Sequence, residues 1–174
     1  MVDLEKFLAE LEAQQSKLPP VHLWQPNHVG EIDIRIDREG RWFHDGVIIR
    51  RAAMIKVFAS VLRRENDDYF LVTPQDKLRI VVEDVPFVAV QMEALSKQNQ
   101  QQILFITNVG DHVVAGADHS IWIVNERPYV GVRDRLHALI SRSVYYRLVD
   151  LATVTNNHAF ISSAGESFDL GAIA

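Results

Sequence analysis

The segment DYFLVTPQDKLRI, residues 68–80, decides the fold, because a similar segment, HAFISSAGESFDL, recurs ninety positions later at residues 158–170. Each copy consists of an apolar stretch, a polar turn and a second apolar stretch. The aligned apolar pairs are Phe70 with Phe160, Leu78 with Phe168 and Ile80 with Leu170. Short apolar runs bounded by turn residues are typical of strands, so each copy predicts a β-hairpin. The recurrence predicts two related units in one chain.

A second pair of hairpins lies upstream of these copies. In IDIRID, residues 32–37, isoleucines alternate with charged residues, and the chain turns at Gly40. The segment ILFITNVGDHVVAG, residues 103–116, follows the same plan with a turn at Gly110. Glycine adopts the positive φ of such turns without steric cost, so we predict that both glycines do so.

An arginine precedes an amphipathic pattern in each half of the chain. Arg50 precedes RAAMIKVFASVLRRE, residues 51–65, and Arg133 precedes DRLHALISRSVYYRLVDLA, residues 134–152. Apolar residues recur at helical spacing in both segments, which predicts two helices. The arginines are 83 positions apart and the closing hairpins 90, so we infer an insertion of seven residues, about two helical turns.

These patterns predict an α+β fold made of two repeated β-rich subdomains, each a hairpin, a helix and a hairpin curled around that helix. The alternative is that two unrelated α+β pieces share a common pattern. The predicted organisation is an N-terminal helix (2–18) and linker in residues 1–29, a first subdomain in residues 30–95 and a second in residues 96–174. Pro19 and Pro20 end the predicted helix.

Composition and missing motifs narrow the classes of function. The chain has 174 residues, no cysteine and a net charge of −5, which argues against thiolate chemistry and a general nucleic-acid partner. No apolar run approaches a membrane span, so we expect a cytoplasmic protein without a membrane partner. No nucleophile elbow, phosphate-binding loop or dinucleotide fingerprint occurs in the sequence. We therefore expect no catalytic residues and no cofactor.

Four blocks of the sequence resemble a bacterial family called domain of unknown function 1285. They are GEIDIRIDREGRWFHDGVIIRR, FLVTPQDKLRIVVEDVPFVA, FITNVGDHVVAGADH and PYVGVRDRLHALISRSVYYRLVDLA, which occur in family order between Trp24 and Gly171. The resemblance implies a cytoplasmic protein of two similar subdomains, the second loosely like a pleckstrin-homology fold. It also implies a signalling role and a ligand site at the subdomain interface, for a nucleotide-like molecule. It implies no catalytic residues.

Arginines are the candidate ligand-binding residues, because the guanidinium group offers a planar fork of donors to phosphate or carboxylate. Two roles are open for them: a structural salt bridge to Asp84, Asp134 or Asp150, or binding of an anion. The predicted ligand-binding residues are Arg50, Arg133, Arg142, Asn108, Thr73 and Tyr145. Two Asp-His pairs, at residues 111–112 and 118–119, lack further ligands in sequence, so we predict no metal site.

The sequence therefore favours a non-enzymatic ligand-binding or sensory protein whose small anionic, nucleotide-like ligand lies between the subdomains. One alternative is an adaptor with a protein partner, since barrels like the pleckstrin-homology fold present sheet edges and grooves to peptides. A further alternative is a hydrolase whose catalytic residues come together only in space.

Overall fold

The computed structural model describes residues 18–173, and the chain divides between Asp84 and Val85 into two compact units. We call residues 1–84 unit 1 and residues 85–174 unit 2, and we describe each by itself. The N-terminal helix predicted for residues 2–18 lies outside the described residues, apart from Leu18. No helix in the described part of the chain is long and apolar enough to cross a membrane.

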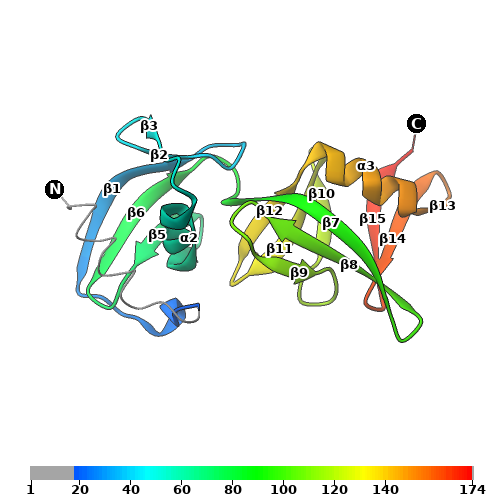
Figure 1. The fold of residues 1–174 in the computed structure, drawn as a ribbon, viewed down its shortest axis with the longest axis horizontal. Helices are drawn as coiled ribbons and strands as arrows, with labels where there is room; N and C mark the ends of the chain where they lie inside the picture. Colours follow the sequence, from blue (N-terminus) through cyan, green and yellow to red (C-terminus); the bar gives the residue numbers. More distant parts are fainter. Residues whose placement is uncertain (1–17, 174) are drawn as a thin grey trace. The chain divides into compact units, whose positions relative to one another are not determined.

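Residues 18–84, the described part of unit 1, form a curled six-stranded sheet with one α-helix, which Figure 1 draws within the curl of the sheet. Its strand order is β3-β2-β1-β6-β5-β4, and neighbouring strands are antiparallel except β1 and β6, which are parallel. Two three-stranded meanders are thus joined by their first and last strands. The elements are η1 (Val21–Leu23), β1 (His28–Ile36), β2 (Trp42–His44), β3 (Val47–Ile48), α2 (Ala52–Ser60), β4 (Leu62–Glu65), β5 (Asp68–Val72) and β6 (Asp76–Val82).

The core of unit 1 forms where the helix meets the alternating apolar residues of the strands. Ile34 and Ile36 of β1 are fully buried, as the alternation in IDIRID predicts. Phe58 of α2 is also fully buried and stacks on Trp42 of β2, with ring centroids 6.1 Å apart. Gly40 has the positive φ predicted for its turn, 77°. The helix ends earlier than predicted, because residues 62–65 form strand β4.

Unit 2 contains a second six-stranded sheet, a three-stranded sheet and one helix among its described residues. The larger sheet has the order β10-β11-β12-β7-β8-β9, again with its two meanders joined by a parallel pair, β7 and β12. The smaller sheet is the meander β13-β14-β15. The elements are β7 (Phe87–Lys97), β8 (Gln100–Thr107), β9 (His112–Val114), β10 (Ile121–Val124), β11 (Arg127–Arg133), β12 (Leu136–Ile140), α3 (Arg142–Leu151), β13 (Thr153–Thr155), β14 (His158–Ser163) and β15 (Glu166–Ala172).

Helix α3 joins the two sheets of unit 2. Val144 and Leu148 form its buried face, and the helix contacts both β7 and β14. The Arg147 guanidinium donates to the carbonyl of Met92 in β7 at 3.0 Å, and the Tyr145 hydroxyl donates to the carbonyl of Leu170 in β15 at 2.7 Å. The helix is therefore held to a strand of each sheet.

The duplicated plan is a meander, a helix and a second meander. It is formed once by β1–β3, α2 and β4–β6, and again by β10–β12, α3 and β13–β15. Ninety positions separate the starts of the two helices, Ala52 and Arg142, and also those of the closing strands, Asp76 and Glu166. The repeat predicted from the two closing hairpins is thus present. The predicted match of the hairpin at Gly40 with the hairpin at Gly110 is wrong, because β1–β3 corresponds to β10–β12, and Gly110 belongs to an additional meander, β7–β9, in unit 2.

The helix predicted for residues 134–152 is wrong in its first half, where residues 136–140 form strand β12. Leu136, Ala138 and Ile140 are buried and alternate with half-buried residues, which is the period of a strand. Leu136 and Ile140 also stand four positions apart, the spacing of a helix face. The two periods coincide over so short a stretch, and pairing with β7 and β11 selects the strand.

The inferred insertion of seven residues is also wrong, because it depended on that helix. With one constant offset of ninety, Arg50 aligns with Ile140, and Arg133 aligns with Phe43. Arg50 lies in the loop before α2, whereas Arg133 ends strand β11. The two arginines are therefore not equivalent positions of the repeat.

The boundary between the units lies in the loop from β6 to β7. The sequence-based boundary between residues 95 and 96 would divide β7, which pairs with β8 as far as Lys97. Both units are β-rich, each with one α-helix in its described part, so the fold is α+β with strands predominating.

Candidate functional site

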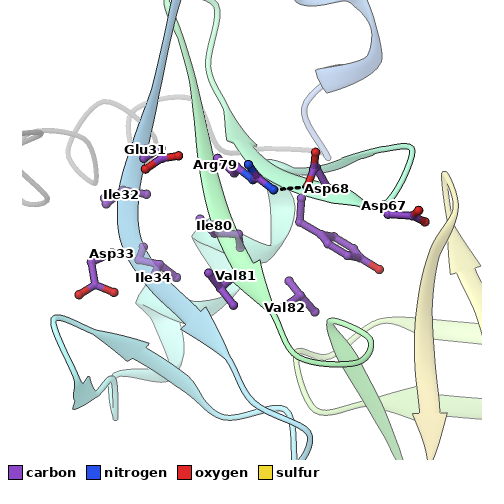
Figure 2. A pocket seen from close by; sticks show the side chains of 11 residues that line it. Glu31, Ile32, Asp33, Ile34, Asp67, Asp68, Arg79, Ile80, Val81 and Val82 are labelled. Atoms are coloured by element: carbon purple, nitrogen blue, oxygen red, sulfur yellow. Dashed lines mark hydrogen bonds and ion pairs between the residues drawn. The ribbon is translucent and has the colours of Figure 1, made fainter.

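A hollow on unit 1 opens between β1 and β6, with a volume of about 480 Å³. It is lined by residues 31–34 of β1, residues 67–69 around the start of β5 and residues 79–82 of β6 (Figure 2). An irregularity in the pairing of β1 with β6 accounts for it. Glu31 lies opposite Arg79 and Arg35 opposite Val81, so β1 advances four residues while β6 advances two. The extra residues of β1 have no partner in β6, and the strands part there.

The charges around this β1–β6 hollow are already paired or separated. Arg79 forms an ion pair with Asp68 on the neighbouring strand (Figure 2). Asp33 and Asp67 lie at opposite sides of the view in Figure 2, and Asp67 pairs with Arg64 at 3.4 Å. Tyr69 is 7% exposed, and burial raises the pKa of its hydroxyl. Carboxylates outnumber the single guanidinium group of Arg79 in the lining, which disfavours an anionic ligand, and we assign the hollow no ligand.

A second hollow, of about 270 Å³, lies beside the β11–β12 hairpin of unit 2. Its lining comes from loops and strands and combines charged and aromatic side chains. The lining residues are Asp118, Ser120, Trp122, Gly131, Val132, Arg133, Asp134, Arg135, Leu136 and His137. The tight turn of the hairpin has positive φ at both Asp134 and Arg135, 42° and 63°. This β11–β12 hollow therefore brings two guanidinium groups to the same place as an indole ring.

The aromatic wall of the β11–β12 hollow is rigid. The Trp122 ring stacks on Tyr129 with centroids 5.9 Å apart, and it meets the His137 ring edge-on at 4.7 Å. Trp122 and Tyr129 are cross-strand partners in β10 and β11, which fixes their spacing. An aromatic residue in a strand usually fills the core, but the Trp122 side chain is only half-buried.

Arg133 carries an ion pair as well as lining the hollow. Its guanidinium group donates to the Asp111 carboxylate, and its Cζ atom lies 5.1 Å from the centre of the Phe87 ring. The side chains of Arg133 and Asp111 are 17% and 21% exposed. The salt-bridge role that the sequence left open is thus present for Arg133, with Asp111 as a partner. The pair holds the guanidinium group in one position at the edge of the hollow.

Three of the other predicted ligand-binding residues form hydrogen bonds within their own unit. The hydroxyl of Thr73, which is 2% exposed, accepts from the amides of Gln75 and Asp76 in the β5–β6 turn. The Asn108 side chain accepts from the amide of Val88 at 3.0 Å. The Tyr145 hydroxyl fastens α3 to β15. These side chains stabilise a turn, a strand end and a helix.

Arg142 and Arg50 are both exposed. Arg142 begins α3, and its Nε donates to the hydroxyl of Tyr146, one helical turn later, at 2.7 Å. Residues four positions apart are neighbours on the surface of a helix. Of the six predicted residues, Arg133 alone lines one of these hollows, which lie within the described residues 18–173. That all six surround one ligand between the units stays a prediction.

The two Asp-His pairs take part in the fold. His112 and His119 each contact a backbone carbonyl through Nδ1, that of Gly110 at 3.1 Å and that of Gly131 at 3.0 Å. Gly110 has the predicted positive φ, 91°. Among residues 18–173 no three His, Asp or Glu side chains come together in a group that could hold a metal ion.

Sequence reasoning missed Arg135 and His137 as hollow-lining residues because it read residues 134–152 as one helix. An Asp-Arg turn between two alternating segments would have been the signal for the hairpin. The irregularity in β1 has no such signal, because an even number of extra residues keeps the alternation of IDIRID unchanged.

Comparison with known proteins agrees with this division of the chain. The family model "Domain of unknown function (DUF1285), N-terminal domain" matches residues 19–85, and "Protein of unknown function (DUF1285), C-terminal domain" matches residues 86–170. No curated protein matches the chain.

Two solved structures are similar to this chain. One is a DUF1285 family protein from Silicibacter pomeroyi DSS-3, 42% identical, with a TM-score of 0.89 over 99% of this chain and 97% of that one. The other is a DUF1285 family protein from Shewanella baltica OS155, 28% identical, with a TM-score of 0.57 over 67% of this chain and 90% of that one. The two family models together match most of the chain, so this protein belongs to the DUF1285 family and has its duplicated two-domain architecture.

Proposed function

We propose that this protein is a non-enzymatic, sensory binding protein for a small anionic, nucleotide-like ligand, and that the ligand binds at the β11–β12 hollow of unit 2. The observation that carries the proposal is the meeting of Arg133, Arg135 and Trp122 around one hollow. A nucleotide-like molecule needs these two chemistries together, a cationic donor for its anionic group and a flat apolar face for its ring.

Each lining group has a role in this proposal. Arg135 is exposed at the tip of the hairpin, where its guanidinium group can close over an anionic group. Arg133 is held by Asp111, so little side-chain entropy is lost when it binds a ligand. The carboxylates of Asp118 and Asp134 are acceptors for ligand hydroxyl or amino groups, which gives the hollow a mixed character suited to such a molecule.

The other parts of the sequence prediction belong to the same proposal. A role in signal transduction, a cytoplasmic location and a likeness of unit 2 to the pleckstrin-homology fold are supported by the family resemblance. The adaptor and the hydrolase remain the alternative functions. No particular observation in either unit favours them over ligand binding.

Thermal unfolding in the presence of nucleotides and small phosphorylated metabolites tests the proposal. A ligand at 100 times its dissociation constant should stabilise the protein by about 2.7 kcal/mol, which raises the melting temperature measurably. With a ligand identified, Arg135→Ala should weaken binding at least fivefold in isothermal titration calorimetry. Arg142→Ala is the matched control, because Arg142 is an exposed arginine of the same unit that does not line the hollow.

Two results would contradict the proposal. One is the absence of any stabilising compound in a panel that covers mono-, di- and triphosphates of all common nucleosides. The other is equal loss of affinity in Arg135→Ala and Arg142→Ala, which would indicate general attraction by positive charge.

A further inference from the structure

The two copies of the repeat differ at the seam between their first and last strands. In unit 1 the first and last strands of the repeat, β1 and β6, pair in parallel. The corresponding strands of unit 2, β10 and β15, lie in contact, yet they belong to different sheets and are not paired. A groove of about 380 Å³ lies along this seam, between Ile121–Ile123 of β10 and residues 167–171 of β15. We call it the β10–β15 groove. It corresponds to the β1–β6 hollow of unit 1, because residues 121–123, which line the groove, are ninety positions after residues 31–33, which line the hollow.

The additional meander of unit 2 explains why the seam is open. The residues that would correspond to the start of β1 are 118–121, and in unit 2 the first two of them lie in the turn that follows β9. Gly116 and His119 close that turn with two backbone hydrogen bonds, of 3.1 and 3.2 Å. Strand β10 therefore begins later than the corresponding strand β1 does, and it does not pair with β15. Both β10 and β15 keep one edge without a strand partner.

The walls of the β10–β15 groove combine apolar side chains with polar groups. Ile121, Trp122 and Ile123 line one side, and Phe168 lines the other. The corresponding residues in β1 are Glu31, Ile32 and Asp33, so two charged positions of unit 1 are apolar in unit 2. Ser167, Asp169 and Gly171 place polar groups beside these apolar side chains, and small-molecule sites combine the two kinds of group.

Asp169 supplies the only ionisable side chain that lines this groove in the described structure. Its carboxylate accepts from the amide of Gly171 at 2.8 Å and pairs with His158 at 2.9 Å, and these hydrogen bonds lower its pKa. The side chain is 47% exposed, so it keeps room for a further donor. The corresponding residue of unit 1 is Arg79, so the charge at this position is reversed between the copies.

We propose that the β10–β15 groove binds a small aromatic amine, with its ring against Trp122 and Phe168 and its ammonium group on Asp169. The half-buried indole ring of Trp122 favours an aromatic ligand, and the single carboxylate favours a positive charge over a negative one. This site is separate in chemistry from the β11–β12 hollow, although Trp122 lines both. The proposal therefore does not depend on the proposed nucleotide-like ligand.

Titration of the full chain with tryptamine, followed by ¹H–¹⁵N NMR, tests the proposal. The amides of Ile121–Ile123 and Gly171 should shift with a single saturable curve. Indole-3-acetate has the same ring with a negative charge, and it should bind at least fivefold more weakly. Asp169→Asn should weaken tryptamine binding at least fivefold, because it removes the charge while the side-chain oxygen still accepts from Gly171.

The matched control is Asp68→Asn, a carboxylate of unit 1 with the same 47% side-chain exposure and its own ion pair. It should leave tryptamine binding unchanged, and so should Arg135→Ala. The proposal is overturned if tryptamine causes no saturable shifts at these amides, if indole-3-acetate binds equally well, or if Asp68→Asn weakens binding as much as Asp169→Asn does.

Discussion

The turn between β1 and β2 depends on one buried carboxylate, that of Asp37. It is 3% exposed and accepts hydrogen bonds from the amides of Glu39 and Arg41, at 3.0 and 2.9 Å. The Arg41 Nε donates to the other carboxylate oxygen at 2.7 Å. Burial alone would raise the pKa of Asp37, but the hydrogen bonds and the charge of Arg41 outweigh it, and the pKa is lowered. The ionised form is thus the one that the turn stabilises.

Asp37 should make the stability of the protein fall in acid. Because its pKa is lower in the folded state than in the unfolded one, its contribution is fully present above the unfolded pKa, near 4, and is lost as the pH falls through the folded pKa. Urea unfolding between pH 7 and pH 3 measures the effect. Asp37→Asn should lower the free energy of unfolding at pH 7 and flatten its decline in acid. An unchanged pH dependence in Asp37→Asn would contradict this account.

At the scale of elements, one hydroxyl fastens the two sheets of unit 2 together. Ser163, in β14, is fully buried. Its Oγ donates to the carbonyl of Ala115 at 2.7 Å and accepts from the amide of Ile103 in β8 at 2.8 Å. The corresponding residue of unit 1 is Thr73, whose buried hydroxyl accepts from two amides of its own turn. The repeat keeps a buried hydroxyl here, but its partners differ.

Ser163→Ala should therefore destabilise the protein. The substitution leaves one buried amide and one buried carbonyl without their partner, and each costs about 1–3 kcal/mol. We expect the free energy of unfolding, measured with urea, to fall by about 2–4 kcal/mol. Its neighbour Ser162 is exposed, so Ser162→Ala should change stability by less than about 0.5 kcal/mol. Equal effects of the two substitutions would contradict the proposed role.

At the scale of the whole molecule, each unit has its own core around its own helix. Phe58 and Trp42 are the centre of the core in unit 1, whereas Val144 and Leu148 of α3 are buried in unit 2. The two family models divide the chain at nearly the same place as the contacts do. Substitutions in one core should therefore act first on the unit that contains it.

Phe58→Ala tests this independence. Removal of a buried phenylalanine ring costs about 3–5 kcal/mol, because it loses apolar burial and leaves a cavity. In native-state hydrogen exchange the amides of β5 and β6 should lose protection by that amount, while the amides of β8 keep theirs. Equal loss of protection in β8 would indicate one cooperative core instead of two.

Local patterns in the sequence were sufficient for strand β1, for the two closing hairpins and for the glycine turns. Alternation predicts strands wherever one face is buried, and Gly40 and Gly110 have the positive φ that their turns require. The offset of ninety, visible in the two closing hairpins, extends over the helices as well. These features depend on neighbours in sequence, which is why they could be predicted.

Only the tertiary structure decided which of two compatible periods residues 136–140 follow, and which side chains meet. Pairing with β11 and β7 makes this segment a strand, and the hairpin with β11 carries Arg135 and His137 to the β11–β12 hollow. The open seam between β10 and β15 likewise follows from the additional meander of unit 2 and leaves no mark in the local pattern. Contacts between distant strands determine both, since the free energy of pairing and burial outweighs the small local preference for helix or strand.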